Sequence, residues 1–270
     1  MTATRLGLSR WEWLAARIRM SVTAAAIAAL VLGFFAPVPR WWPWVVIATA
    51  IPATALYFRL GTPHGDPVDI LAPVLGRWRA VNSPTSRVPS HFVHAWSQTY
   101  AIDLVFDPAE GSRPQLAWRP LARRPDAYPG FGQDIVAPID GDVVRARSFM
   151  RDHLSRSSPP GLLYLILESV REFLGPTGVL GNHVVIRRHD GVHVLMAHLR
   201  QGSLLVEGGD SVERGSKIAE CGNSGNSTEP HVHVQAMDCA SVWLAAGLPI
   251  RFDHAELPPN GGLLESERLA

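Results

Sequence analysis

The sequence predicts a mainly β protein: an antiparallel β-sheet or sandwich domain with one inserted helix, preceded by an N-terminal transmembrane helical hairpin. Three observations support this prediction. Two apolar stretches lie near the N-terminus, short alternating runs separated by Gly, Asp and Asn fill most of the remaining chain, and one stretch of helical character interrupts those runs. A chain of 270 residues is long enough for one sizeable core and an appendage.

The two apolar stretches cover residues 20–38 and 41–58, and each is near the lower length limit for spanning a bilayer. Trp41, Trp42 and Trp44 cluster where aromatic rings favour the headgroup region, and the PVPR link offers a tight turn. We therefore expect residues 1–60 to form a membrane anchor of two helices. A cleaved signal peptide and a buried soluble hairpin are the alternatives.

The rest of the chain divides by composition. Residues 61–89 are rich in Pro, Gly and Ser and are expected to be a linker, residues 90–252 form the main domain, and residues 253–270 form a tail. Strands are predicted at 100–106, 141–146, 183–187, 193–199 and 231–235. A helix is predicted at 160–175, inside an insertion of about 150–178. This helix either packs on the β domain, rests on the membrane surface or forms a lid; packing is the simplest interpretation.

Charge and cysteine content narrow the function. A formal net charge of +1 leaves no basic surplus for a phosphate backbone, so nucleic acid is not an expected partner. With two cysteines the chain cannot build a four-cysteine zinc site, so a metal would rest on His and carboxylate ligands. Cys221 and Cys239 either form one disulfide or are two small thiols.

The strongest chemical signal is His231-Val232-His233 on a predicted strand. Side chains at positions i and i+2 of a strand point to the same face, so both imidazoles project into one site. His198 ends the preceding strand, where antiparallel pairing brings it near His231. Upstream, His91 and His94 precede a strand that carries Asp103. Two His and one Asp leave the fourth tetrahedral position open, as in a catalytic zinc site.

These segments together resemble the lysostaphin-type (LytM-like) zinc endopeptidases of bacterial peptidoglycan. The matching stretches run from about Gly76 to about Phe252: AIDLV, APIDGDVVRA, GNHVVI, MAHL, VEGGDSVERGSKIAECGNSGNSTEP and HVHVQ. The resemblance implies that Asp103 and His233 are zinc ligands, that His231 is the general base, and that His198 helps to stabilise the tetrahedral intermediate.

The first ligand departs from the family pattern. The family usually has His four residues before the Asp, where this chain has Thr99. His91 and His94 are the candidates, displaced upstream by a longer loop. His91 is favoured because it lies in the compact Pro-Ser-His turn, and His94 stays as the alternative.

The resemblance implies a Zn²⁺-dependent metalloendopeptidase that hydrolyses peptide bonds in peptidoglycan stem or cross-bridge peptides, with a zinc-activated water and a histidine base. The alternative is an inactive member of the same fold that binds the wall or activates another hydrolase. The implied partners are the wall peptide and membrane lipid, contacted through the N-terminal helices. The implied location is the bacterial cell membrane with the catalytic domain outside. The arginines that flank the apolar stretches argue against that orientation under the positive-inside rule.

The other histidines and two Gly- and Asp-containing phrases carry weaker signals. The remaining histidines are expected to be surface or packing residues; they are His64, His153, His183, His189, His193 and His254.

The phrases APIDGDVV and GDSVERGSKIAECG are also typical of biotinyl or lipoyl carrier domains, which modify a lysine at a hairpin tip. Lys217 lies inside the second phrase, and a carrier has no use for the histidine set, so this interpretation is disfavoured.

Overall fold

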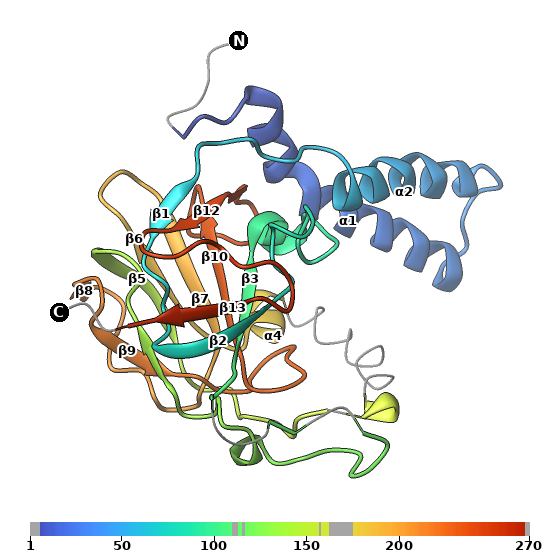
Figure 1. The fold of residues 1–270 in the computed structure, drawn as a ribbon. Coiled ribbons are helices and arrows are strands. Elements are labelled where there is room, and N and C mark those ends of the chain that lie inside the picture. The colour runs from blue at the N-terminus through green and yellow to red at the C-terminus, as the bar shows by residue number, and fades with distance from the viewer. Residues whose placement is uncertain (1–5, 110–112, 115–116, 157, 162–174, 268–270) are drawn as a thin grey trace.

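A helical hairpin projects from a β domain in the computed structural model of the chain (Figure 1). The structure describes residues 6–109, 113–114, 117–156, 158–161 and 175–267. Most of the helix predicted at 160–175 lies outside the described residues. The predicted mainly antiparallel β architecture is confirmed.

Nine strands form the main sheet of the described residues, in the spatial order β13-β2-β3-β10-β7-β6-β5-β8, with β11 added beside β10. Two further pairs, β1–β12 and β4–β9, lie apart from it. The strands are β1 (Val68–Ile70), β2 (Gly76–Val81), β3 (Ile102–Phe106), β4 (Asp134–Val136), β5 (Gly141–Arg147), β6 (Asn182–Arg187), β7 (His193–Leu199), β8 (Ser211–Val212), β9 (Lys217–Glu220), β10 (Val232–Met237), β11 (Gly247–Leu248), β12 (Ile250–Phe252) and β13 (Leu263–Ser266). The helical elements are α1 (Arg10–Phe35), α2 (Trp42–Phe58), the 3-10 turns η1 (Ala95–Tyr100) and η2 (Pro125–Ala127), and α4 (Pro176–Leu180).

All five predicted strands are present as β3, β5, β6, β7 and β10. Two segments expected outside the domain instead belong to its sheet. The expected linker at 61–89 contains β1 and β2, and the expected tail at 253–270 contains β13, which pairs with β2. Both differences from the expected boundaries arise at β2, which pairs with strands that are distant in sequence. Trp78 and Ala80 of β2 alternate and are fully buried, but the Pro- and Gly-rich residues around them obscure this pattern in the sequence.

The alternation of the central strands separates the core from the opposite face of the sheet. Ile102 and Leu104 of β3 and Val232 and Val234 of β10 pack into the larger hydrophobic core. Residues between them along each strand point the other way, because successive side chains of a strand alternate in direction. That second face carries Asp103 and the paired histidines described below.

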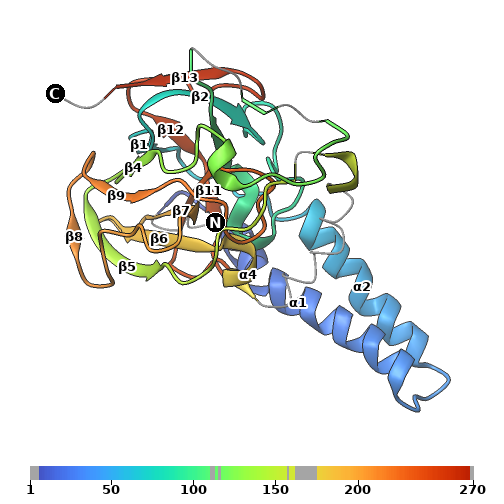
Figure 2. The ribbon, with the colours of Figure 1, turned by 90° about the horizontal axis from the view of Figure 1, so that it is seen from below.

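Helices α1 and α2 pack against each other, and the indole of Trp42 donates a hydrogen bond to Ala29 O at 2.9 Å. Helix α1 begins earlier than the apolar stretch predicts, because Ser9 and Glu12 form a capping box at its start. Of the described helices, α1 alone is long and apolar enough to cross a membrane by length and hydropathy; α2 is shorter. The far ends of both helices extend away from the β domain (Figures 1 and 2).

The near end of the hairpin is fastened to the β domain. The guanidinium of Arg17 donates to both carboxylate oxygens of Asp238, at 3.2 and 2.9 Å. Arg19 is buried and donates to carbonyl oxygens that include those of Leu56 (2.8 Å) and His94 (3.2 Å). At Gly61, which has a φ of +72°, a Cβ would lie 2.3 Å from the Cβ of Ala15. The helical hairpin and the β domain are therefore in direct contact rather than separated by a linker.

Candidate metal centre

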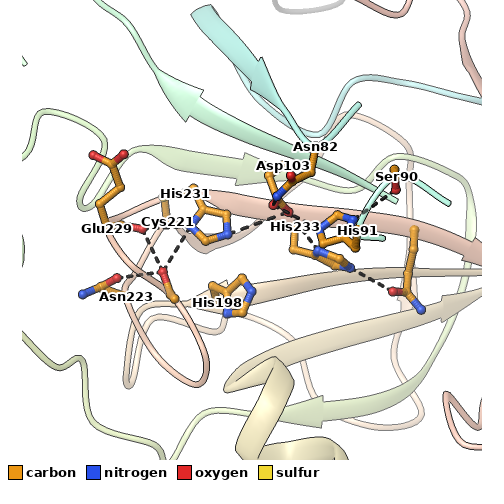
Figure 3. A network of polar contacts seen from close by, with 12 residues as sticks. Asn82, Ser90, His91, Asp103, His198, Cys221, Asn223, Glu229, His231 and His233 are labelled. Carbon is orange, nitrogen blue, oxygen red and sulfur yellow. Dashed lines mark hydrogen bonds and ion pairs between the residues drawn. The ribbon is translucent and has the colours of Figure 1, made fainter. Parts of the chain in front are cut away.

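The carboxylate of Asp103 contacts the imidazoles of His91 and His233 (Figure 3). Its Oδ2 is 3.0 Å from His91 Nε2, and its Oδ1 is 2.9 Å from His233 Nδ1. One ligand atom from each of the three residues lies within 4.8 Å of the other two. Asp103 and His233 are direct partners across the antiparallel β3–β10 pair, which places both side chains on the same face of the sheet.

The third residue of this cluster comes from the loop before β3. His91 and His233 lie with their ring centroids 4.8 Å apart. His94 lies elsewhere: its imidazole contacts the hydroxyls of Thr99 and Thr62 at 3.0 and 3.3 Å. Of the two candidates that the sequence left open, the structure brings His91 to Asp103, whereas His94 is a buried hydrogen-bonding residue.

The outer nitrogens of both imidazoles are already occupied. Ser90 Oγ donates to Gln98 O (3.1 Å) and so accepts from His91 Nδ1–H (3.0 Å). Gln235 donates its amide to Trp96 O (3.1 Å), so its Oε1 accepts from His233 Nε2–H at 2.8 Å. These partners assign the tautomers and leave a lone pair on each inner nitrogen, directed at a carboxylate.

Electrostatic interactions keep the Asp103 carboxyl ionised. Burial by itself raises the pKa of the Asp103 carboxyl, but the nearby imidazoles of His91 and His231 and the contacts with His233 and His91 outweigh it, so the pKa lies well below its usual range. Burial lowers the pKa of His91 and outweighs the opposing effect of Asp103. One ionised carboxylate and two imidazole nitrogens therefore converge on one point. Such a donor set fits a divalent cation, and zinc accepts N and O ligands of this kind.

His231 lies beside the cluster without being part of it. Its Nε2 is 3.8 Å from Asp103 Oδ1. Its Nδ1–H is held by Glu229 O at 2.8 Å and lies 3.1 Å from Ser227 Oγ. Ser227 in turn contacts Asn223 Oδ1 at 2.8 Å. The Gly-rich turn before β10 thus fixes the ring and leaves its Nε2 lone pair facing the same space as the cluster.

His198 reaches the site through a β-bulge. Along the β6–β7 pair, Asn182 pairs with Leu199 and His183 with Ala197, so His198 is an extra residue without a partner in this register. Its φ of +63° is rare for a residue with a side chain. Strict alternation would send His198 to the core face; the bulge instead brings its ring to 4.6 Å from that of His231.

His198 Nδ1–H is held by Ser224 O at 2.9 Å. Burial, followed by the charges of His231 and His233, lowers the pKa of His198 well below its usual value. The resting side chain therefore presents a lone pair from Nε2, and it can donate a hydrogen bond from that atom only after it has taken up a proton.

Sequence reasoning missed the residues that orient the site. Gln235 lies two positions after His233, so strand alternation places both side chains on the same face of the sheet. This pattern could have identified Gln235 from the sequence. Asn82 donates to Asp103 Oδ2 at 2.9 Å and has a φ of +52°. It follows β2, which was not predicted, so no local signal identified it.

Both cysteines and two of the remaining histidines lie away from the Asp103 cluster. Cys221 and Cys239 are free thiols, so the disulfide alternative is wrong. His183 is buried with Nδ1 bonded to Gly181 O, and His153 packs on Gly225 O, in agreement with packing roles. Neither belongs to the metal-ligand cluster of the described residues.

Comparison with known proteins gives a family match for part of the chain. Residues 167–242 match the family model described as Peptidase family M23. This stretch is therefore similar to peptidase family M23, which confirms the predicted resemblance to lysostaphin-type endopeptidases at the level of the family. The matched region includes His198, His231 and His233; His91 and Asp103 lie before it, so their inclusion rests on the geometry above.

One relative of known name is the DD-carboxypeptidase/endopeptidase Mpg of Neisseria meningitidis serogroup B. It is 39% identical over 69 residues, which are 26% of this chain and 15% of that protein. The chain thus matches about one seventh of the length of this curated relative.

Similar solved structures include the catalytic domain of lysostaphin from Staphylococcus simulans, with 19% identity over 54% of this chain and 72% of that chain and a TM-score of 0.31. The deep-sea M23 metalloprotease pseudoalterin has 11% identity over 73% of this chain and 85% of that chain, with a TM-score of 0.38. At these scores neither likeness adds to the family match.

Proposed function

We propose that the chain is a zinc metalloendopeptidase in which His91, Asp103 and His233 hold the metal. The observation that carries this proposal is the convergence of the Asp103 carboxylate with two imidazole nitrogens whose opposite N–H groups are already bonded. Bound zinc would lower the pKa of a coordinated water and polarise the scissile carbonyl. Three protein ligands leave room for that chemistry.

The other two histidines supply the proton chemistry in this proposal. His231 accepts a proton at Nε2, because its Nδ1–H remains fixed on Glu229 O. His198 stabilises negative charge on the reacting oxygen through a protonated Nε2, while Ser224 O holds its Nδ1–H. The two ring centroids lie 4.6 Å apart, so in this proposal both imidazoles line one side of the substrate site.

The proposed substrate is a peptide of bacterial peptidoglycan, in the stem or the cross-bridge. Support comes from the family assignment and from the named activity of the Neisseria relative, carboxypeptidase and endopeptidase. We further propose that residues 1–60 anchor the chain in the cell membrane. The exposed apolar surface of the projecting hairpin supports this, including Ile27, Leu32 and Phe34.

The proposed orientation places the domain outside the cell. Two of the arginines that oppose this orientation under the positive-inside rule, Arg17 and Arg19, are bonded within the protein. Contacts within the protein, rather than the orientation of the chain in the membrane, thus explain the position of Arg17 and Arg19 near the apolar stretches.

The test measures zinc content and activity together in the purified full chain. We expect wild type to retain zinc and to release peptides from isolated peptidoglycan sacculi. Asp103→Asn and His233→Gln lose both properties, whereas His231→Gln keeps zinc and loses activity. His189→Gln, an exposed histidine on the β6–β7 turn, is the matched control and behaves as wild type. Zinc retention without activity in wild type would instead support the inactive binding protein, and absence of zinc would refute the proposal.

A further inference from the structure

An apolar groove of about 920 Å³ separates α2 from the loop that carries His91. The α2 wall includes Ile51, Ala55 and Phe58, and the loop wall includes Val88, Pro89 and Phe92. Ile51 is 65% exposed and Phe92 is 61% exposed, although both side chains are large and apolar. Exposed apolar surface of this kind marks a site for a partner.

Two arginines border this groove, Arg59 from the end of α2 and Arg87 from the loop. The guanidinium carbon of Arg87 lies 3.5 Å from the centre of the Phe92 ring, which holds the charge over the apolar wall. No acidic side chain pairs with either arginine in the part of the chain that the structure describes. The groove therefore combines an apolar floor with two uncompensated positive charges.

The groove continues the apolar face of the projecting hairpin. Trp44, Ile47, Ile51 and Phe58 are all exposed and recur at spacings of three, four and seven residues, so they lie along one face of α2. Helix α2 begins at the far end of the hairpin and ends where the hairpin meets the β domain (Figure 1). A molecule in the groove would lie against the same surface that the proposed bilayer covers.

The groove is also connected to the metal centre through the backbone. Phe92, which directly follows His91, has a φ of +65°. Further along the same loop, His94 N donates to Tyr57 O of α2 at 2.8 Å, and His94 O accepts from Arg19. The position of the His91 loop is thus fixed on one side by Asp103 and on the other by the hairpin.

We propose that this groove binds one anionic phospholipid, which holds the His91 loop in place. An acyl chain lies along Ile51, Ala55 and Phe92, and the phosphate contacts Arg59 and Arg87. The charge of the two arginines and the continuity with the apolar face of α2 favour this occupant. The inference rests on the membrane placement of the hairpin in the proposed function.

The test is native mass spectrometry of the full chain in detergent, with equal amounts of palmitoyl-oleoyl phosphatidylglycerol and phosphatidylcholine. We expect one bound phosphatidylglycerol, preferred about tenfold over phosphatidylcholine. Thr54→Trp, an exposed position inside the groove, removes this lipid. Leu30→Trp, which places the same ring on the exposed surface of α1, leaves it bound. Joint replacement of Arg59 and Arg87 by Gln abolishes the preference between the two lipids.

Hydrogen exchange of residues 87–94 supplies the second measurement. Phosphatidylglycerol slows exchange in wild type and in Leu30→Trp but not in Thr54→Trp. Equal lipid binding by both Trp variants, equal binding of the two lipids by wild type, or unchanged exchange in this loop would each overturn the inference. Neither measurement uses zinc or a wall substrate. Failure of the lipid inference can therefore be distinguished from failure of the peptidase proposal, which is tested by zinc content and activity.

Discussion

Replacing Gln235 by Leu tests whether the neighbours of the candidate ligands control metal binding. Gln235 accepts the Nε2–H of His233 at 2.8 Å and is 1% exposed. Without this acceptor, the tautomer with a lone pair on His233 Nδ1 is no longer favoured, and a buried N–H loses its partner. Loss of such an outer contact typically weakens metal binding about 10- to 100-fold, or about 1.4 to 2.8 kcal/mol.

The assay is a competition titration with a fluorescent zinc chelator, run on wild type, Gln235→Leu and the exposed control Gln201→Leu. Thermal unfolding of the metal-free proteins separates loss of affinity from loss of fold. We expect the control to match wild type. A folded Gln235→Leu protein with wild-type zinc affinity would refute the reasoning that Gln235 orients a metal ligand.

Three further perturbations test other contacts. Ser227→Ala removes a hydroxyl that contacts His231, and we expect kcat on wall peptides to fall about tenfold with zinc affinity unchanged. Arg19→Met leaves buried carbonyls without a donor and should lower the free energy of unfolding by about 3 kcal/mol in detergent, whereas Arg10→Met should not. Burial lowers the pKa of His183 to about 4, so the unfolded chain takes up its proton first as the pH falls below about 6.5. Wild type should therefore lose up to about 2 kcal/mol more stability than His183→Gln between pH 7 and pH 5 in denaturant titrations.

The sheet and half of the site could be predicted because their signals are local. Alternation along β10 places His231 and His233 on one face whatever the partner strands are. Asp103 belongs to a strand with the same alternation, and its pairing with His233 completes the cluster. The bulge that turns His198 away from the core face left no sequence signal. Its proximity to His231 could still be predicted, because the two strands were expected to pair.

The parts that could not be predicted depend on contacts between distant segments. Whether His91 or His94 reaches Asp103 is decided by how the loop packs on α2, which no local pattern encodes. The same holds for β2, whose partners β3 and β13 come from different parts of the chain. By contrast, the early start of α1 was encoded locally, because Ser9 and Glu12 have the spacing of a capping box.

The most direct test of the metal centre is X-ray diffraction from zinc-soaked crystals at the zinc absorption edge. We predict an anomalous difference peak in contact with His91 Nε2, a carboxylate oxygen of Asp103 and His233 Nδ1, with His231 near but not bound. A peak at His94, or one held by His198 and His231 without Asp103, would contradict the ligand set on which the proposed peptidase activity depends.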